Sequence, residues 1–229
     1  MPSVFAHRGL HLIERENTPE AFSAAVALGV DGVELDVRRS LDGALVVHHD
    51  PSVGGLVIAQ TLARDLPSHV AALDEVMEHL RGVRVNVEIK NIRDPSEPTY
   101  DETGDFARQV LAFLDEGDWS ESVIVSCFDL ATCIQVRAID EAVSVGWLWW
   151  DVEPSHALAA AGAARLNAVH PHYSLVDGAL VRRARDLGLD TNVWTVNRDD
   201  DIKAMVSHGV SSIITDDPAL ALAILGERP

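Results

Sequence analysis

The sequence has few cysteines and lacks any long hydrophobic run. Only Cys127 and Cys133 occur among its 229 residues, which predicts two buried, unpaired thiols and excludes a disulfide framework. No stretch approaches the roughly 20 apolar residues of a membrane-spanning helix. The opening segment MPSVFAHRG has neither the basic nor the apolar region of a signal peptide. We therefore expect a cytoplasmic protein without a membrane span.

Basic residues are also scarce. The chain has 18 of them against 36 acidic residues, a formal net charge of −18 at pH 7. Such a surface repels nucleic-acid backbones and anionic lipid head groups, so neither is expected as a partner, although a small anion can still enter a locally positive pocket. Apolar residues make up 47% of the chain and are spread along it, which indicates one globular domain over residues 1–229. The oligomeric state stays open.

Short β-rich runs alternate with helical patterns along the whole chain. Residues 22–29 and 73–80 show the i, i+3, i+4, i+7 apolar spacing of helices, and Thr18-Pro19 marks a helix start. The strand-like runs are residues 4–7, 32–37, 44–48, 83–90, 123–126, 143–149, 168–170, 191–196 and 212–215. Repeated strand–helix units predict a parallel sheet.

At this length the parallel sheet forms either a closed eight-stranded barrel or an open doubly wound sheet. The sequence has no Gly-rich fingerprint after the first strand and no P-loop, which favours the barrel. Nine strand-like runs are one more than a barrel needs. Residues 44–48 follow Asp42-Gly43, a hairpin signal, and are compatible with a return strand, but the sequence does not decide which run is the extra one. The polar residues 91–104 are expected to form a loop beside the site.

Two strand-like runs carry charged residues on one face. Side chains alternate along a strand, so Glu34 and Asp36 share the face that points into a barrel, as do Asn86, Glu88 and Lys90 in a second run. Burying carboxylates requires a partner or a metal. One alternative is internal salt bridges to Lys90. The other is a hard divalent cation, which takes oxygen ligands and which three converging carboxylates fit better.

Histidines stand at the ends of two runs. His7 and Arg8 end the first run, and His49 follows the third. Because the active sites of such barrels lie at the carboxyl ends of the strands, the two histidines beside the acidic rows predict a catalytic site. His170 also ends a run and is a weaker candidate.

In this order, the residues resemble the glycerophosphodiester phosphodiesterase family. The resembling segments run nearly the full length of the chain: AHRG at 6–9, ENTPEAF at 16–22, DGVELDV at 31–37, DGALVVHHDP at 42–51, VNVEIK at 85–90, VWTVN at 193–197 and ITDDP at 214–218. The resemblance implies a single (β/α)8 TIM barrel of the phospholipase-C-like phosphodiesterase type.

The resemblance also implies roles for single residues. It makes His7 and His49 the acid/base pair, and it makes Glu34, Asp36 and Glu88 the ligands of one divalent cation, either Mg²⁺ or Ca²⁺. The implied reaction is hydrolysis of a small glycerophosphodiester to glycerol 3-phosphate and an alcohol. His7 is expected to act first as base and His49 as acid. The nucleophile is either the neighbouring glycerol hydroxyl, which gives a cyclic phosphate, or water.

Further positions match the family's substrate contacts. Arg8 and Lys90 resemble its phosphate-contacting residues, and Trp194 resembles the wall for the glycerol part, although a core tryptophan without substrate contact is the alternative. Glu16 and Asn17 belong to the family motif, and Asn17 could equally order a loop. Residues 51–87 leave room mainly for a helix and a strand, so the insertion after the His-Asp motif is reduced and the pocket is expected to be open. Head-group preference stays undecided.

Three other functions are alternatives. A lysophospholipase D type of activity keeps the chemistry and changes the substrate to single-chain lipids. A barrel that binds a phosphorylated metabolite without cleaving it should have lost a histidine or a ligand, and none is missing. A sugar-phosphate isomerase would not explain paired histidines beside three carboxylates.

Overall fold

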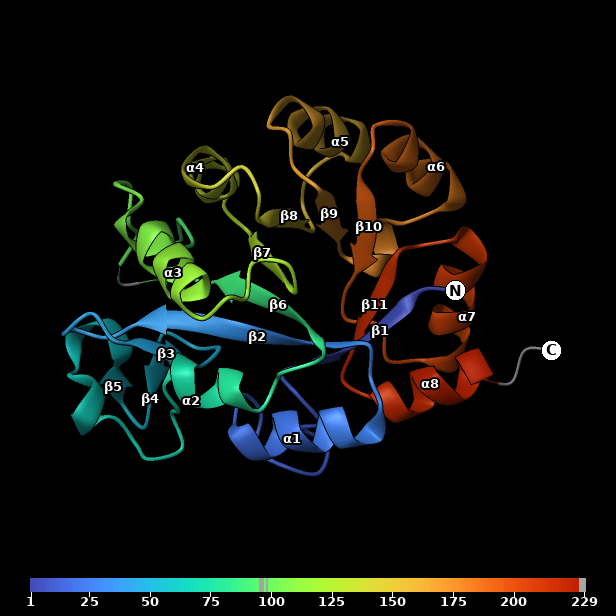
Figure 1. The fold of residues 1–229 in the computed structure, drawn as a ribbon. Coiled ribbons are helices and arrows are strands. Elements are labelled where there is room, and N and C mark those ends of the chain that lie inside the picture. The colour runs from blue at the N-terminus through green and yellow to red at the C-terminus, as the bar shows by residue number, and fades with distance from the viewer. Residues whose placement is uncertain (95–96, 98, 227–229) are drawn as a thin grey trace.

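The computed structural model describes residues 1–94, 97 and 99–226. Within them, eight parallel strands close into a barrel, because the first strand pairs with both the second and the last (Figure 1). In chain order the barrel strands are β1 (Ser3–His7), β2 (Gly32–Arg39), β6 (Arg84–Ile89), β7 (Val123–Cys127), β8 (Ser144–Trp149), β9 (Ala168–Pro171), β10 (Asp190–Val193) and β11 (Ser212–Thr215). The predicted (β/α)8 barrel is confirmed.

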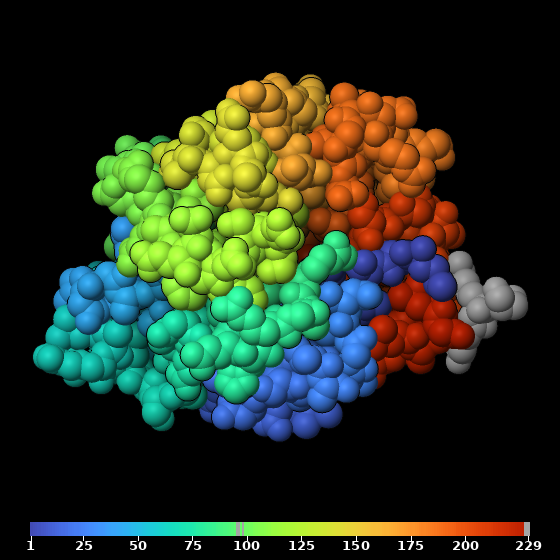
Figure 2. All heavy atoms as spheres, viewed as in Figure 1, coloured from blue at the N-terminus to red at the C-terminus, as the bar shows by residue number. Residues whose placement is uncertain are grey.

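Helices surround the barrel, and consecutive units follow one another around it, so that the red C-terminal unit returns beside the blue N-terminal one (Figure 2). The helices are α1 (Pro19–Leu28), α2 (Leu73–Glu78), α3 (Asp105–Glu116), α4 (Leu130–Ile139), α5 (Pro154–Ala163), α6 (Gly178–Asp186), α7 (Asp199–His208) and α8 (Pro218–Gly226). Every helix of the described residues is too short or too polar to cross a membrane.

Local sequence signals set the ends of α1. The Thr18 side chain caps the helix by accepting from the backbone N–H of Ala21, and Pro19 takes the first helical position. Gly29, predicted as part of the apolar face, instead ends the helix in a left-handed conformation with φ 88°, a geometry that glycine adopts without strain. The prediction for Gly29 was therefore wrong.

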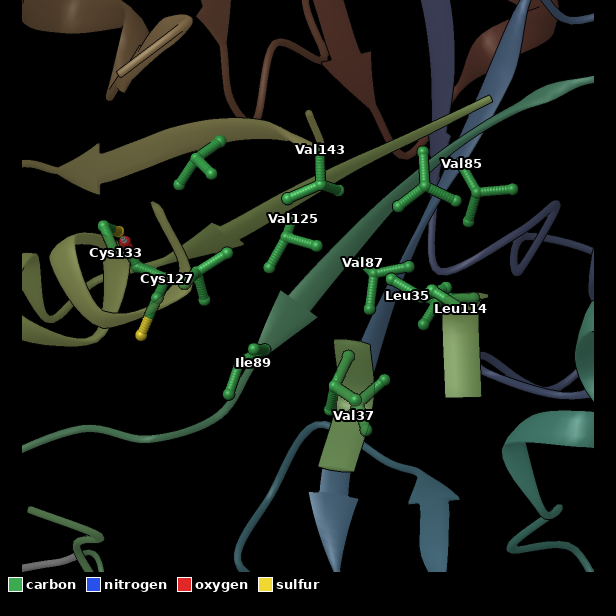
Figure 3. Close-up of a cluster of buried hydrophobic side chains, with 14 of the residues drawn as sticks. Leu35, Val37, Val85, Val87, Ile89, Leu114, Val125, Cys127, Cys133 and Val143 are labelled. Carbon is green, nitrogen blue, oxygen red and sulfur yellow. Dashed lines mark hydrogen bonds between the residues drawn. The ribbon is translucent and has the colours of Figure 1, made fainter. Parts of the chain in front are cut away.

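The main core lies between the barrel and its helices. The outward side chains of β2 and β6 are fully buried there (Figure 3), as their alternation predicts. In Figure 3, Leu114 of α3 lies beside Leu35 and Val87 of these strands. Fully burying one such aliphatic side chain contributes roughly 1.5–3 kcal/mol. The neighbouring Cys127 and Cys133 are buried free thiols, and burial raises the pKa of Cys127 to about 12.

The extra strand-like run, residues 44–48, is the return strand. β3 (Leu45–Val47) pairs antiparallel with the far end of β2 and takes no place in the barrel. The expectation that a helix and a strand would take most of residues 51–87 was wrong, because this segment also forms a small hairpin and two 3-10 turns. These elements are β4 (Ser52–Val53), β5 (Leu56–Val57), η1 (Ile58–Gln60) and η2 (Ala63–Asp65). Figure 1 shows β3, β4 and β5 near the carboxyl end of β2.

One other boundary differs from the prediction. The run 191–196 is a strand only to Val193. Beyond it, the carbonyl of Trp194 still accepts from the N–H of Tyr173, and the N–H of Val196 still donates to the carbonyl of Ile214. Backbone hydrogen bonds therefore continue past the end of the strand. In the predicted loop 91–104, residues 95, 96 and 98 lie outside the described part of the chain, while Glu97 reaches the end of β2.

Candidate active site

A cavity of about 100 Å³ lies at the carboxyl ends of the barrel strands. Every residue predicted to act in catalysis, substrate contact or metal binding lines it except Asp36, which is buried directly beside it with 1% of its surface exposed. The lining residues are His7, Arg8, Glu34, His49, Asn86, Glu88, Lys90, Phe128, Leu148, Trp194, Thr195 and Ile214. The fold thus brings together residues from both halves of the sequence.

Three carboxylates form the floor of the site. β2 and β6 run parallel in a register that places Asp36 opposite Glu88, and one carboxylate oxygen each of Glu34, Asp36 and Glu88 lies within 4.8 Å of the others. All three side chains are buried. Among the described residues, Oε1 of Glu34 has no hydrogen-bond partner. A buried carboxylate oxygen without a partner is the kind of ligand that a hard cation takes, so this set fits a divalent cation.

Neighbouring charges shift the pKa values of Asp36 and Glu34 in opposite directions. Lys90 Nζ lies 2.7 Å from Glu88 Oε1 and 3.3 Å from Asp36 Oδ1, so the predicted internal salt bridges do form. Burial acts to raise the pKa of Asp36, but Lys90 and then Arg8 outweigh it and hold that pKa well below its usual range. For Glu34 the result is opposite: burial first, then repulsion from Asp36 and Glu88, raises its pKa well above the ordinary value. The basic residues therefore compensate the charge of Glu34 only in part.

His7 is held by a carboxylate that the sequence analysis did not assign. Its Nδ1 lies 2.6 Å from Asp216 Oδ1, and His11 Nε2 lies 2.9 Å from the same oxygen. Burial acts to raise the pKa of Asp216, but hydrogen bonds from His11 and His7 outweigh it and lower that pKa, so Asp216 is ionised and accepts. His7 Nδ1 then donates, which leaves Nε2, 3.8 Å from Glu34 Oε2, to exchange a proton. The sequence signal that could have identified Asp216 is the ITDDP motif, which lies at the end of β11, the strand beside β1.

His49, which also lines the cavity, has a similar arrangement. It follows β3, and its Nδ1 lies 2.8 Å from Asp50 Oδ1. The hydrogen bond from His49 lowers the pKa of Asp50, so the ring donates through Nδ1 and Nε2 is the free nitrogen. Burial, and then the positive charge of Lys90, lowers the pKa of His49, which favours the neutral ring in the free protein.

The loop between β1 and α1 orders the acidic floor. Arg8 Nη1 donates to both oxygens of Glu16, at 3.0 and 3.2 Å, and Arg8 Nε lies 3.3 Å from Asp36 Oδ2. Asn17 Nδ2 donates to the same Asp36 oxygen at 2.8 Å. Arg8 and Asn17 both adopt the left-handed backbone region, with φ of 56° and 58°. Such strain is common at functional sites, and here it turns both side chains toward Asp36.

Aromatic side chains form part of the cavity wall. The rings of Trp194 and Phe128 meet edge to face, with centroids 5.3 Å apart, and both line the cavity. Trp194 Nε1 donates to the backbone oxygen of His170 at 2.7 Å. His170 itself does not line the cavity. Its ring is fully buried and bonds Asn192, so the structure places this weaker candidate in the barrel interior and outside the site.

Comparisons with known proteins agree with this geometry. The model of the "Glycerophosphoryl diester phosphodiesterase family" matches residues 7–220. A "Glycerophosphodiester phosphodiesterase" of Caldanaerobacter subterraneus subsp. tengcongensis is 30% identical, with 94% of each chain covered.

Two solved structures have the same fold. A glycerophosphodiester phosphodiesterase from Parabacteroides distasonis superposes with a TM-score of 0.88 at 24% identity, covering 99% of this chain and 98% of the other. The Oleispira antarctica phosphodiesterase in complex with the product sn-glycerol-3-phosphate has a TM-score of 0.85 at 18% identity, with the same coverage.

Proposed function

The chain belongs to the glycerophosphoryl diester phosphodiesterase family and is a phosphoric diester hydrolase, and we propose that it cleaves small glycerophosphodiesters by histidine acid–base catalysis beside a divalent cation. The products are glycerol 3-phosphate and an alcohol. The observation that carries this proposal is the convergence of two histidines, each hydrogen-bonded to a carboxylate, on one cavity beside the cluster of Glu34, Asp36 and Glu88.

Members of this family generally use a divalent cation, and these three carboxylates are the residues that would hold it. When bound, the cation would act as a Lewis acid that offsets the negative charge of the phosphate. An all-oxygen donor set suits both Mg²⁺ and Ca²⁺. Because Arg8 and Lys90 compensate the charge of Glu34 only in part, further positive charge is favoured at this position.

The basic residues of the site bind the phosphate. Arg8 and Lys90 line the cavity, and together they supply fixed positive charge in a protein of net charge −18. A guanidinium can grip two phosphate oxygens at once, whereas an ammonium acts as a point charge. Trp194 and Phe128 provide an apolar wall for the glycerol part, which orients the ester oxygen toward the histidines.

His7 and His49 exchange the protons. His7 Nε2 takes the proton of the nucleophile, and the ionised Asp216 stabilises the imidazolium that forms. His49 protonates the leaving alcohol. Since burial and Lys90 lower the pKa of His49 in the free protein, its role as acid requires the negative phosphate to favour the charged ring. We therefore expect a bell-shaped pH–rate profile. The limb that reports the pKa of His49 should lie at higher pH in the profile of kcat than in the profile of kcat/KM.

The nucleophile is the neighbouring glycerol hydroxyl or water. Attack by the hydroxyl forms a five-membered cyclic phosphate, which water then opens, with the two histidines exchanging roles. Following the reaction by ³¹P NMR separates the routes, because only the first shows a transient cyclic phosphate before glycerol 3-phosphate.

Histidine variants test the proposed catalysis. Glycerophosphocholine and glycerophosphoethanolamine would be supplied with Mg²⁺ or Ca²⁺, and glycerol 3-phosphate release followed. We expect H7A and H49A each to lower kcat at least about 100-fold, while H156A, which removes an exposed histidine of α5, leaves it unchanged. Equal activity of H49A and wild type would contradict the histidine mechanism, and no release by folded wild type would contradict the substrate class.

Lysophospholipid hydrolysis is the second candidate, and one observation favours it. Leu12 and Ile13, 61% and 73% exposed, lie in the loop after β1, and Trp150, 66% exposed, lies in the loop after β8. Both loops leave the carboxyl ends of barrel strands, where the cavity opens, and exposed apolar residues can contact an acyl chain. Faster turnover of lysophosphatidylcholine than of glycerophosphocholine would move this candidate to first place.

A further inference from the structure

A buried arginine contacts the backbone of His49. Arg38 is the next inward residue of β2 after Glu34 and Asp36, and only 6% of it is exposed. Its Nε and Nη2 donate to the carbonyl oxygen of His49 at 2.9 and 2.5 Å. Two N–H groups of one guanidinium therefore converge on a single backbone oxygen of the residue that carries the catalytic ring.

The other edge of the Arg38 guanidinium is fixed by Glu97. Arg38 Nη1 donates to Glu97 Oε2 at 2.8 Å and Nη2 donates to Oε1 at 3.0 Å, and the Glu97 side chain is 9% exposed. Such a two-pronged pair holds the guanidinium plane in one orientation. The bridge thus runs from the loop before α3, through the end of β2, to the backbone of His49.

His49 needs this contact because little else holds it. The backbone of the preceding His48 is tied to β2 through its N–H, which donates to Asp36 at 2.9 Å. Among the described residues, the carbonyl of His49 accepts only from Arg38. The ring is bonded to Asp50, whose side chain is 68% exposed and therefore offers a weak anchor. Arg38 is the buried contact that fixes the residue.

We propose that Arg38, oriented by Glu97, is a positioning residue that holds His49 in reach of the leaving oxygen. The inference rests on the proposed function, in which His49 transfers the proton. Arg38 acts through the His49 backbone and does not line the cavity over the carboxylates. Its loss therefore lowers the rate of proton transfer and leaves substrate binding largely intact.

Arg137 of α4 provides a matched control. It is 8% exposed and also donates to backbone carbonyls, those of Arg165, Asp140 and Glu141. It does not line the catalytic cavity. An R137Q substitution removes a buried arginine that likewise donates to backbone carbonyls, so a loss of rate caused only by weakened packing should appear in R137Q as well as in R38Q.

The test is a double-mutant cycle in kcat for glycerophosphocholine hydrolysis. We expect R38Q to lower kcat about 10- to 100-fold with KM changed less than about threefold, since small misplacements of a catalytic group cost this much. In an H49A background, R38Q should lower kcat further by less than about twofold, because the ring through which it acts is gone. R137Q should change kcat less than about threefold in either background. R38K, which keeps one donor, should fall between R38Q and wild type.

A second readout does not depend on turnover. The ring nitrogen signals of His49, assigned by their loss in H49A, should shift in R38Q and in E97Q but stay in place in R137Q. Unchanged signals in R38Q and E97Q, or equal losses of kcat from R38Q with and without His49, would overturn the proposal. If R38Q does not fold, R38K and E97Q supply the same comparison. An inactive wild type would instead contradict the proposed function, and the ring signals would still decide the role of Arg38.

Discussion

Replacing Glu34 by glutamine should stabilise the cation-free protein and weaken cation binding. Glu34 is 3% exposed and lies within 4.8 Å of Asp36 and Glu88. At an effective dielectric constant of about 20, each like-charged pair at that spacing costs about 3 kcal/mol. Arg8 and Lys90 offset part of this cost, so we expect a net gain of about 2 kcal/mol for E34Q. For a domain of this size, that raises Tm by about 4–8 °C.

The effect should depend on pH in a defined direction. Because the pKa of Glu34 in the folded protein lies above its ordinary value of 4.5, the folded state holds a proton that the unfolded state releases. The stability contributed by protonated Glu34 is therefore full below about pH 4.5 and is lost as pH rises through the folded pKa. E34Q lacks this loss, so its advantage over wild type should grow from pH 4.5 toward pH 8.

Thermal unfolding with chelator and with added cation measures both effects. Saturating Mg²⁺ or Ca²⁺ at about 100 times Kd should stabilise wild type by about 2.7 kcal/mol and E34Q by much less. E121Q, which changes an exposed glutamate, is the control and should match wild type throughout. The reasoning would be refuted if E34Q were less stable than wild type in chelator at pH 8, or if both were stabilised equally by the cation.

Three further changes address other parts of the fold. D216N should lower kcat about 100-fold without changing the circular dichroism spectrum, because the carboxylate that sets the orientation and tautomer of His7 is lost; an unchanged kcat would show that the contact is incidental. G146A should lower the free energy of unfolding by about 2 kcal/mol, since a Cβ there would overlap His170 Nε2. G162A, with nothing within 4 Å of its Cβ, should leave it unchanged. Urea titrations measure the free energy of unfolding of both variants. Burial lowers the pKa of His170 to about 3 from 6.5, so its contribution to stability should be full above about pH 6.5 and decline as pH falls toward 3, and H170Q should show a flatter acid limb in the same titrations.

Much of the barrel follows from alternation along the strands. In β2 and β6 the apolar side chains face the helices and the charged ones face inward, and this pattern alone placed Glu34, Asp36, Glu88 and Lys90 together. It works because a strand offers only two faces and the buried outer face admits only apolar residues. The hairpin signal at Asp42-Gly43 likewise pointed to the return strand, although only the pairing of β3 with β2 identified it as the extra one.

Alternation stops being informative where a strand ends. β11 ends at Thr215, and the next two residues are both aspartates. Asp216 turns toward His7, whereas Asp217 caps α8 by accepting from the backbone of Leu220 at 3.0 Å. Which of the two serves the site depends on backbone torsions after the strand, and the residue types do not show these. The role of Asp216 therefore required the structure.

Arg38 and His170 show a second limit. Alternation puts Arg38 on the inward face, but its acceptors come from the backbone of His49 and from Glu97 in a distant loop. His170 ends a strand as a catalytic histidine would, yet it is buried because Gly146 on the neighbouring strand leaves space for its ring. In both residues, contacts between segments far apart in the sequence decide the role.

We propose that the carboxylate cluster binds a cation on which phosphodiester cleavage depends. The most direct measurement is release of glycerol 3-phosphate from glycerophosphocholine by chelated protein titrated with Mg²⁺ or Ca²⁺. Wild type should be inactive in chelator and saturate with one of the ions, and E34Q should require a much higher concentration. Full activity of wild type in chelator, or identical titration curves for the two proteins, would contradict the account.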